Sequence, residues 1–143
     1  MRKVSEVLSR KGSAVVEVRA TQNVIEALQL MAEKNIGSVV VKDENGRYRG
    51  ILTERDYSRK IILLHRSSTE TTVAEIMSTD LPKISLFDTV EHCMQLMTDN
   101  NVRYLPVFSG EELKGIISMT DVVKETILAQ QETIDQLKQY ITL

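Results

Sequence analysis

This sequence contains an internal repeat, and a repeated sequence predicts one structural unit that is built twice. The segment VRATQNVIEALQLMAEKNIGSVVV (18–41) aligns with ISLFDTVEHCMQLMTDNNVRYLPV (84–107). Upstream, KVSEVL (3–8) resembles TVAEIM (72–77), and downstream GILTERDY (50–57) resembles GIISMTDV (115–122). The order of these segments is the same in both copies, so the chain is a tandem duplication.

Each copy predicts the element order β-α-β-β-α, which makes an α+β fold. In the first copy, residue patterns predict strands at 15–18, 37–41 and 48–52 and helices at 23–34 and from 53 toward 64. Asn45-Gly46 predicts the hairpin turn between the last two strands. The second copy predicts a strand near 83–85, a helix at 89–99, strands at 103–108 and 113–117, and a helix that begins at 118.

We divide the chain into a first repeat at 1–66, a second repeat at 67–125 and a C-terminal amphipathic helix at 126–143. The polar stretch RSSTETT (66–72) serves as the linker. One repeat of about 60 residues buries only a small core by itself. We therefore expect the two repeats to pack with approximate twofold symmetry, so that equivalent strand ends meet at one crevice.

Composition narrows the range of functions. A net charge of -2 gives no electrostatic case for nucleic acid or for an anionic membrane, and 4% aromatic residues disfavour a stacking platform for single strands. No apolar run has the length of a signal peptide or of a membrane span, so we expect a cytoplasmic protein.

The few cysteine and histidine residues argue against catalysis and metal binding. The single cysteine, Cys93, excludes an intramolecular disulfide, and its alignment with Ala27 predicts a small buried side chain. His65 and His92 have no companions at metal-ligand spacing. No histidine base stands in the motifs at 50–56 and 115–121, so we expect neither a hydrolase triad nor a metal site.

Those two motifs, 50–56 and 115–121, both read glycine, two aliphatic residues, a hydroxyl residue, two variable positions and an aspartate. The hydroxyl and the aspartate match a helix capping box, which needs no ligand. The capping box does not explain the glycine, which in a strand indicates a turn or a close approach. A glycine, a strand end and a helix N-terminus make a corner that suits an anion, and an aspartate can accept from both hydroxyls of a ribose.

On this repeated motif, residues 3 to about 125 resemble a tandem pair of cystathionine-β-synthase (CBS) domains, a Bateman module of the stand-alone bacterial type. The resemblance implies a regulatory module, not an enzyme, that binds an adenosine-containing nucleotide between the repeats: AMP, ADP, ATP, NAD or S-adenosylmethionine. The nucleotide would be a regulatory ligand and not a catalytic cofactor. The resemblance also implies a homodimer that signals to a separate effector protein; the alternative is a ligand-independent dimerisation or adaptor module.

In that family the aspartate holds the ribose hydroxyls, and the hydroxyl residue and its neighbours approach ribose or phosphate. The candidate ligand-binding residues are therefore Thr53, Arg55, Asp56, Arg59, Arg103, Ser118, Thr120 and Asp121. Arg103 occupies a strand start that often supplies a basic phosphate contact in the family, although a charge at an edge strand that discourages aggregation explains it equally well.

The two motifs differ in the charge that follows them. Arg55, Arg59 and Lys60 follow the first hydroxyl residue, whereas Lys124 is the first cation of the second helix. Guanidinium groups bind phosphate well, so we expect the first site to favour polyphosphate. The alternative is a solvated face on which neighbouring carboxylates neutralise the arginines.

The C-terminal tail carries an apolar stripe at near-heptad spacing. Its members are Val123, Ile127, Ile134, Leu137 and Ile141, and Gln130 interrupts them. Such a stripe predicts packing against another chain, and the alternative is a helix folded back on its own module.

Overall fold

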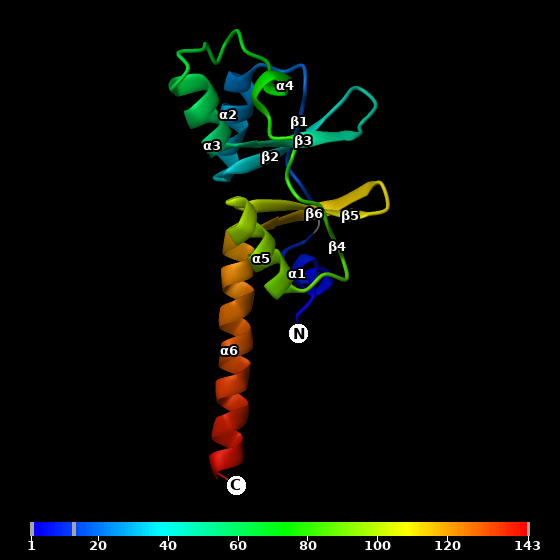
Figure 1. The fold of residues 1–143 in the computed structure, drawn as a ribbon, viewed down its shortest axis with the longest axis vertical. Coiled ribbons are helices and arrows are strands. Elements are labelled where there is room, and N and C mark those ends of the chain that lie inside the picture. The colour runs from blue at the N-terminus through cyan, green and yellow to red at the C-terminus, as the bar shows by residue number, and fades with distance from the viewer. Residues whose placement is uncertain (1, 13, 143) are drawn as a thin grey trace. The chain divides into compact units, whose positions relative to one another are not determined.

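The structure, a computed structural model, describes residues 2–12 and 14–142 of the chain (Figure 1). The elements in chain order are α1 (Val4–Lys11), β1 (Glu17–Arg19), α2 (Val24–Lys34), β2 (Ser38–Lys42), β3 (Tyr48–Thr53), α3 (Glu54–Tyr57), a π-helix η1 (Ser58–Ile62), α4 (Val73–Ile76), β4 (Ile84–Ser85), α5 (Val90–Asn100), β5 (Tyr104–Ser109), β6 (Glu112–Ser118) and α6 (Met119–Thr142). The β-α-β-β-α order predicted for each copy is confirmed. No helix of the described residues is both long and apolar enough to span a membrane.

The chain forms two compact units that exchange their first helices. The first unit is Val15–Leu81, and the second unit combines the N-terminal segment up to Ala14 with the chain from Pro82 onward. Helix α1 begins the first sequence repeat but packs in the core of the second unit, through Val4, Val7 and Leu8. Helix α4 begins the second repeat but packs in the core of the first unit. The compact units therefore differ from the sequence repeats at 1–66 and 67–125.

Each unit has one sheet of three strands with the same topology. In the first unit the order is β1-β2-β3, where β1 runs parallel to β2 and β2 antiparallel to β3. In the second unit the order is β4-β5-β6 with the same directions. A parallel neighbour requires a crossover, and α2 and α5 are those crossover helices. Each core lies where the buried side chains of sheet and helices meet, around Leu52 in one unit and Leu105 in the other.

Asparagine ends both crossover helices in the same way. Asn35 and Asn101, which align in the repeat, each adopt a left-handed backbone with φ of 53° at the helix C-cap. Asparagine tolerates this conformation better than most residues that have a side chain. The two repeats therefore share the residue that ends the crossover helix as well as the helix itself.

The helices that follow β3 and β6 differ. The sequence predicted one helix from 53 toward 64, but the structure has the short α3 followed by the π-helix η1. Within η1, Ile61 is buried in the core of the first unit while Ile62 is exposed. After β6, by contrast, α6 continues as one α-helix of 24 residues.

Candidate functional site

Each of the two repeated glycines lies where another segment comes close to its strand. A Cβ built on Gly50 would lie 2.5 Å from the backbone oxygen of Ser78, which follows α4. Ser78 forms backbone hydrogen bonds of 2.8 and 3.0 Å with Ile51 at this point. A Cβ on Gly115 would lie 2.9 Å from Cδ2 of Leu8 in α1. The exchange of α1 and α4 thus explains both glycines, because each exchanged segment lies where a side chain would otherwise stand.

The first corner, Thr53 to Asp56, is a complete capping box. The backbone N–H of Asp56 donates to Oγ1 of Thr53 at 3.1 Å, and Oδ2 of Asp56 accepts from the backbone N–H of Thr53 at 3.0 Å. The hydroxyl of Thr53 also donates to Oδ2, at 3.0 Å. Thr53 and Asp56 are therefore brought together as the motif predicted, and their hydrogen bonds are local.

The other oxygen of Asp56 is held by more distant residues. Oδ1 accepts from the hydroxyl of Ser78 at 2.8 Å and pairs with Nζ of Lys60 at 3.1 Å. Lys60 also donates to the backbone oxygen of Ile76 at 2.9 Å, so it joins η1 to the end of α4. Asp56 is 5% exposed. A ribose that used this carboxylate would have to replace Ser78 or Lys60 as its partner.

The second corner, Ser118 to Asp121, repeats the cap in a more open setting. The backbone N–H of Ser118 donates to Oδ2 of Asp121 at 2.8 Å, and the backbone N–H of Asp121 donates to Oγ of Ser118 at 3.1 Å. Lys11 of α1 donates from Nζ to the same Oδ2 at 2.6 Å and to the backbone oxygen of Ile116 at 2.9 Å. The Asp121 side chain is 15% exposed, against 6% for that of Asp56.

A backbone hydrogen bond ties each corner to the start of the neighbouring strand. The N–H of Glu54 donates to the carbonyl of Gly37 at 3.1 Å, and the N–H of Met119 donates to the carbonyl of Arg103 at 2.8 Å. Arg103, which is exposed, therefore lies at the second corner, at the position that aligns with Gly37 at the first corner.

The remaining candidates lie on the helices that leave the corners. Arg55 belongs to α3, Arg59 is exposed on η1, and Thr120 is exposed in the first turn of α6. Each group of candidates lies within its own unit.

Three contacts of the aspartates were missed by the sequence reasoning. Lys60 was noted only as a cation, although its spacing of four residues from Asp56 is a recognised signal for an ion pair on a helix. Ser78 and Lys11 follow α4 and α1 in the chain, and only the exchange of these helices brings them to the corners. No local pattern encodes such long-range contacts.

The single cysteine is not placed for nucleophilic chemistry. Cys93 is fully buried, as its alignment predicted, and burial raises the pKa of its thiol to about 12, so it is not a thiolate at neutral pH. Among the residues that the structure describes, no three histidine, cysteine, aspartate or glutamate side chains are grouped to hold a metal ion. The corners can offer hydrogen bonds and charge.

Comparison with known proteins gives one consistent family. The sequence pattern described as the CBS domain matches residues 4–63 and 73–127. The mitochondrial CBS domain-containing protein CBSX3 of Arabidopsis thaliana is 34% identical over 146 residues, an alignment that covers 96% of this chain and 71% of that protein.

Solved structures agree in fold. A putative signal-transduction protein with CBS domains from Burkholderia ambifaria has a TM-score of 0.84 at 39% identity, with 90% of this chain and 96% of that chain covered. A hexameric CBS-CP12 protein from bloom-forming cyanobacteria has a TM-score of 0.74 at 28% identity, with 86% of this chain and 70% of that chain covered.

Proposed function

Because this chain belongs to the CBS domain family, we propose that it is a regulatory module that binds an adenosine-containing nucleotide: AMP, ADP, ATP, NAD or S-adenosylmethionine. The observation that carries the proposal is the repeated corner, where a strand end, a hydroxyl and an aspartate recur in both units. Proteins of this family are generally regulatory, and the bound nucleotide would act as a signal and not as a catalytic cofactor.

The aspartates are assigned to the ribose and the cations to the phosphates. Asp56 and Asp121 each accept a backbone hydrogen bond in their caps, and a carboxylate can accept from both hydroxyls of a ribose. At the first corner Arg55 and Arg59 would bind phosphate, with Thr53 beside the ribose. At the second corner Arg103 would bind phosphate, with Ser118 and Thr120 as its polar neighbours.

The hydrogen bond and the ion pair of Asp56 could couple nucleotide binding to a conformational change. A ribose at this carboxylate would displace Ser78 or Lys60, and both of these residues connect the corner to the end of α4. Release of these contacts would loosen α4 in the first unit, a local change that a separate effector protein can read. The signal-transduction description of the Burkholderia structure is consistent with such a role.

A thermal-shift series with adenosine, AMP, ADP, ATP, NAD and S-adenosylmethionine tests the proposal. A ligand that binds only the folded protein increases the free energy of unfolding, by about 2.7 kcal/mol at a ligand concentration of 100 times Kd. The melting temperature rises accordingly. We expect at least one member to raise the melting temperature in a dose-dependent way, and Asp56→Asn or Asp121→Asn to reduce that rise.

A second candidate function is a ligand-independent dimerisation or adaptor module. The observation in its favour is that both aspartates already have partners within their own unit, so each cap is complete without a ligand. If no nucleotide in the series changes the melting temperature at millimolar concentration, the nucleotide proposal fails and this second function stands.

A further inference from the structure

Helix α6 carries an exposed apolar seam that its own unit does not cover. We define the seam as Val123, Ile127, Gln130, Ile134, Leu137 and Ile141, which follow one another at alternating steps of four and three residues. Ile127 is 58% exposed, Leu137 56% and Ile141 80%. Figure 1 shows that the red C-terminal half of α6 runs beyond the other elements of its unit.

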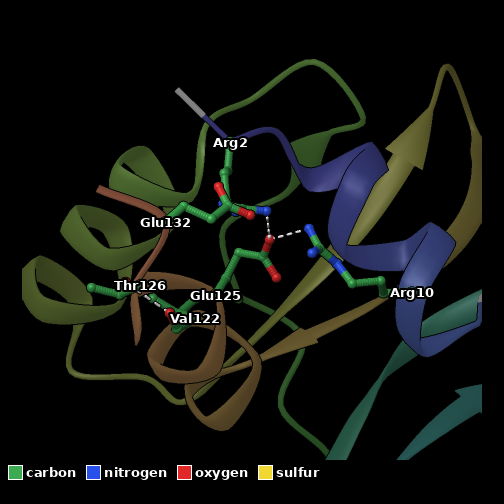
Figure 2. Close-up of polar contacts among 6 residues, drawn as sticks. All are labelled: Arg2, Arg10, Val122, Glu125, Thr126 and Glu132. Atoms are coloured by element: carbon green, nitrogen blue, oxygen red, sulfur yellow. Dashed lines mark hydrogen bonds and ion pairs between the residues drawn. The ribbon is translucent and has the colours of Figure 1, made fainter. Parts of the chain in front are cut away.

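Ion pairs fix which face of α6 contacts its own unit. Glu125 is buried and accepts from Arg2 at 2.8 Å and from Arg10, both of which belong to the N-terminal segment (Figure 2). Arg2 also pairs with Glu132 at 2.5 Å. Glu125 and Glu132 are one heptad apart, so they share a position on the helix, and that position lies opposite the seam. The charges thus hold one face against the unit, and the apolar side chains of the seam are left 45–80% exposed.

We propose that the seam pairs with the same seam of a second copy of this chain, as a parallel two-stranded coiled coil. The seam places isoleucine at the first heptad position three times, at 127, 134 and 141, and leucine at the second position at 137. In a parallel coiled coil, isoleucine at the first position and leucine at the second favour two strands over three or four.

The polar residue in the seam selects the same orientation. In a parallel pair in register, Gln130 faces Gln130 of the second copy, and the two amides can hydrogen bond to each other. In an antiparallel pair the layers are offset, so that Gln130 faces an isoleucine and its amide loses a partner. A single polar layer of this kind sets register at some cost in stability.

The flanking charges agree with a parallel pair. One flank of the seam carries Lys124, Gln131 and Lys138, and the other carries Thr126, Thr133 and Tyr140. Parallel helices place the lysine flank of one copy against the uncharged flank of the other. Antiparallel helices place lysine flank against lysine flank, which is repulsive.

The folded unit compensates for the shortness of the seam. From Val123 to Ile141 the helix is about 27 Å long, which is marginal for an isolated helix. Here the first turns are already packed on the second unit through buried Val122 and Glu125, so helix nucleation is complete before pairing. We expect pairing at micromolar protein concentrations.

Cysteine cross-linking of the full chain tests the pairing and its direction. In a Cys93→Ala background, Leu137→Cys places identical thiols opposite each other only in a parallel pair in register. Gln139→Cys is the matched control, because it is exposed and lies on the face opposite the seam. Under mild oxidation we expect the covalent dimer to form at least tenfold faster with Leu137→Cys. Equal rates, or no dimer with either variant, would overturn the proposal.

Two further arms keep the result decisive. In a mixture of Ile127→Cys and Leu137→Cys chains, a disulfide between the two different variants that forms faster than the disulfide of either variant with itself would show an antiparallel pair and overturn the proposal. Ile134→Asp, added to Leu137→Cys, should abolish cross-linking while the chain still unfolds cooperatively, even if the protein stays dimeric in sedimentation through other surfaces. Gln139→Asp should leave cross-linking intact. Cross-linking that persists with Ile134→Asp would also overturn the proposal.

Discussion

At the scale of single residues, the equivalent glycines of the two motifs have different neighbours: Gly50 lies against a rigid backbone atom and Gly115 against a flexible side chain. A methyl group on Gly50 meets the backbone oxygen of Ser78, whereas a methyl group on Gly115 meets the ends of the flexible Leu8 side chain. Gly50→Ala should therefore lower the free energy of unfolding by about 1–3 kcal/mol, as overpacking does, and Gly115→Ala by clearly less. Urea denaturation of both variants measures this. Equal losses would mean that the contact with the Ser78 backbone is not the reason why position 50 requires glycine.

The two aspartates should also differ in how much they stabilise the fold. Asp56 has Ser78 and Lys60 as partners in addition to its cap and is almost fully buried, whereas Asp121 is more exposed. Asp56→Asn, measured without nucleotide, should cost about 1–3 kcal/mol, because charged hydrogen bonds are lost in a buried place. Asp121→Asn should cost less. A larger loss for Asp121→Asn would contradict the assigned contacts.

At the scale of elements, the cap of α4 predicts a pH dependence. Glu75 accepts from the backbone N–H of Thr72 at 2.7 Å and from its hydroxyl at 3.1 Å, and it pairs with Arg66. These interactions, the backbone hydrogen bond first, hold the pKa of Glu75 below its ordinary value. Since the folded-state pKa is depressed, the stabilisation is present above the ordinary glutamate pKa and is lost as the pH falls through the folded-state pKa.

Glu75→Gln tests this element directly. We expect the variant to have a lower melting temperature than the parent at pH 7 and a smaller decrease on acidification, so that the two melting curves converge toward pH 3. Glu70→Gln, exposed on the same segment, is the control. A constant difference between parent and Glu75→Gln at all pH values would rule out the linkage.

The elements also mark the limit of what the sequence predicts. Periodicity, Asn-Gly and the repeated motif predicted the strands, the crossover helices and both caps, because those features depend on neighbouring residues. The exchange of α1 and α4 depends on which core each helix reaches, and no local pattern encodes it. The π-helix η1 was not predicted either, and the contacts that its residues make, Ile61 in the core and Lys60 with Ile76 of α4, are likewise long-range.

At the scale of the whole molecule, the nucleotide proposal predicts a dependence on phosphate number. Arg55→Ala should leave adenosine binding unchanged and weaken ATP binding by about 1–3 kcal/mol, more at low salt than at high salt. Arg49→Ala is the matched control, because Arg49 lies in the same unit beside the hairpin turn at Asp43 and Asn45. Isothermal titration of adenosine, AMP and ATP measures the series. Equal losses for adenosine and ATP would end the phosphate assignment of Arg55.

The exchanged helices also set an order of events during protein synthesis. The first unit has every residue it needs once Leu81 has left the ribosome, so it can fold while the rest of the chain is still being made. Helix α1 leaves the ribosome before the first unit does, yet the strands and helices that bury Val4 and Leu8 are translated only after the first unit is complete. The residues of α1 thus find their partners only after the first unit can fold, and until then their apolar side chains are available to chaperones.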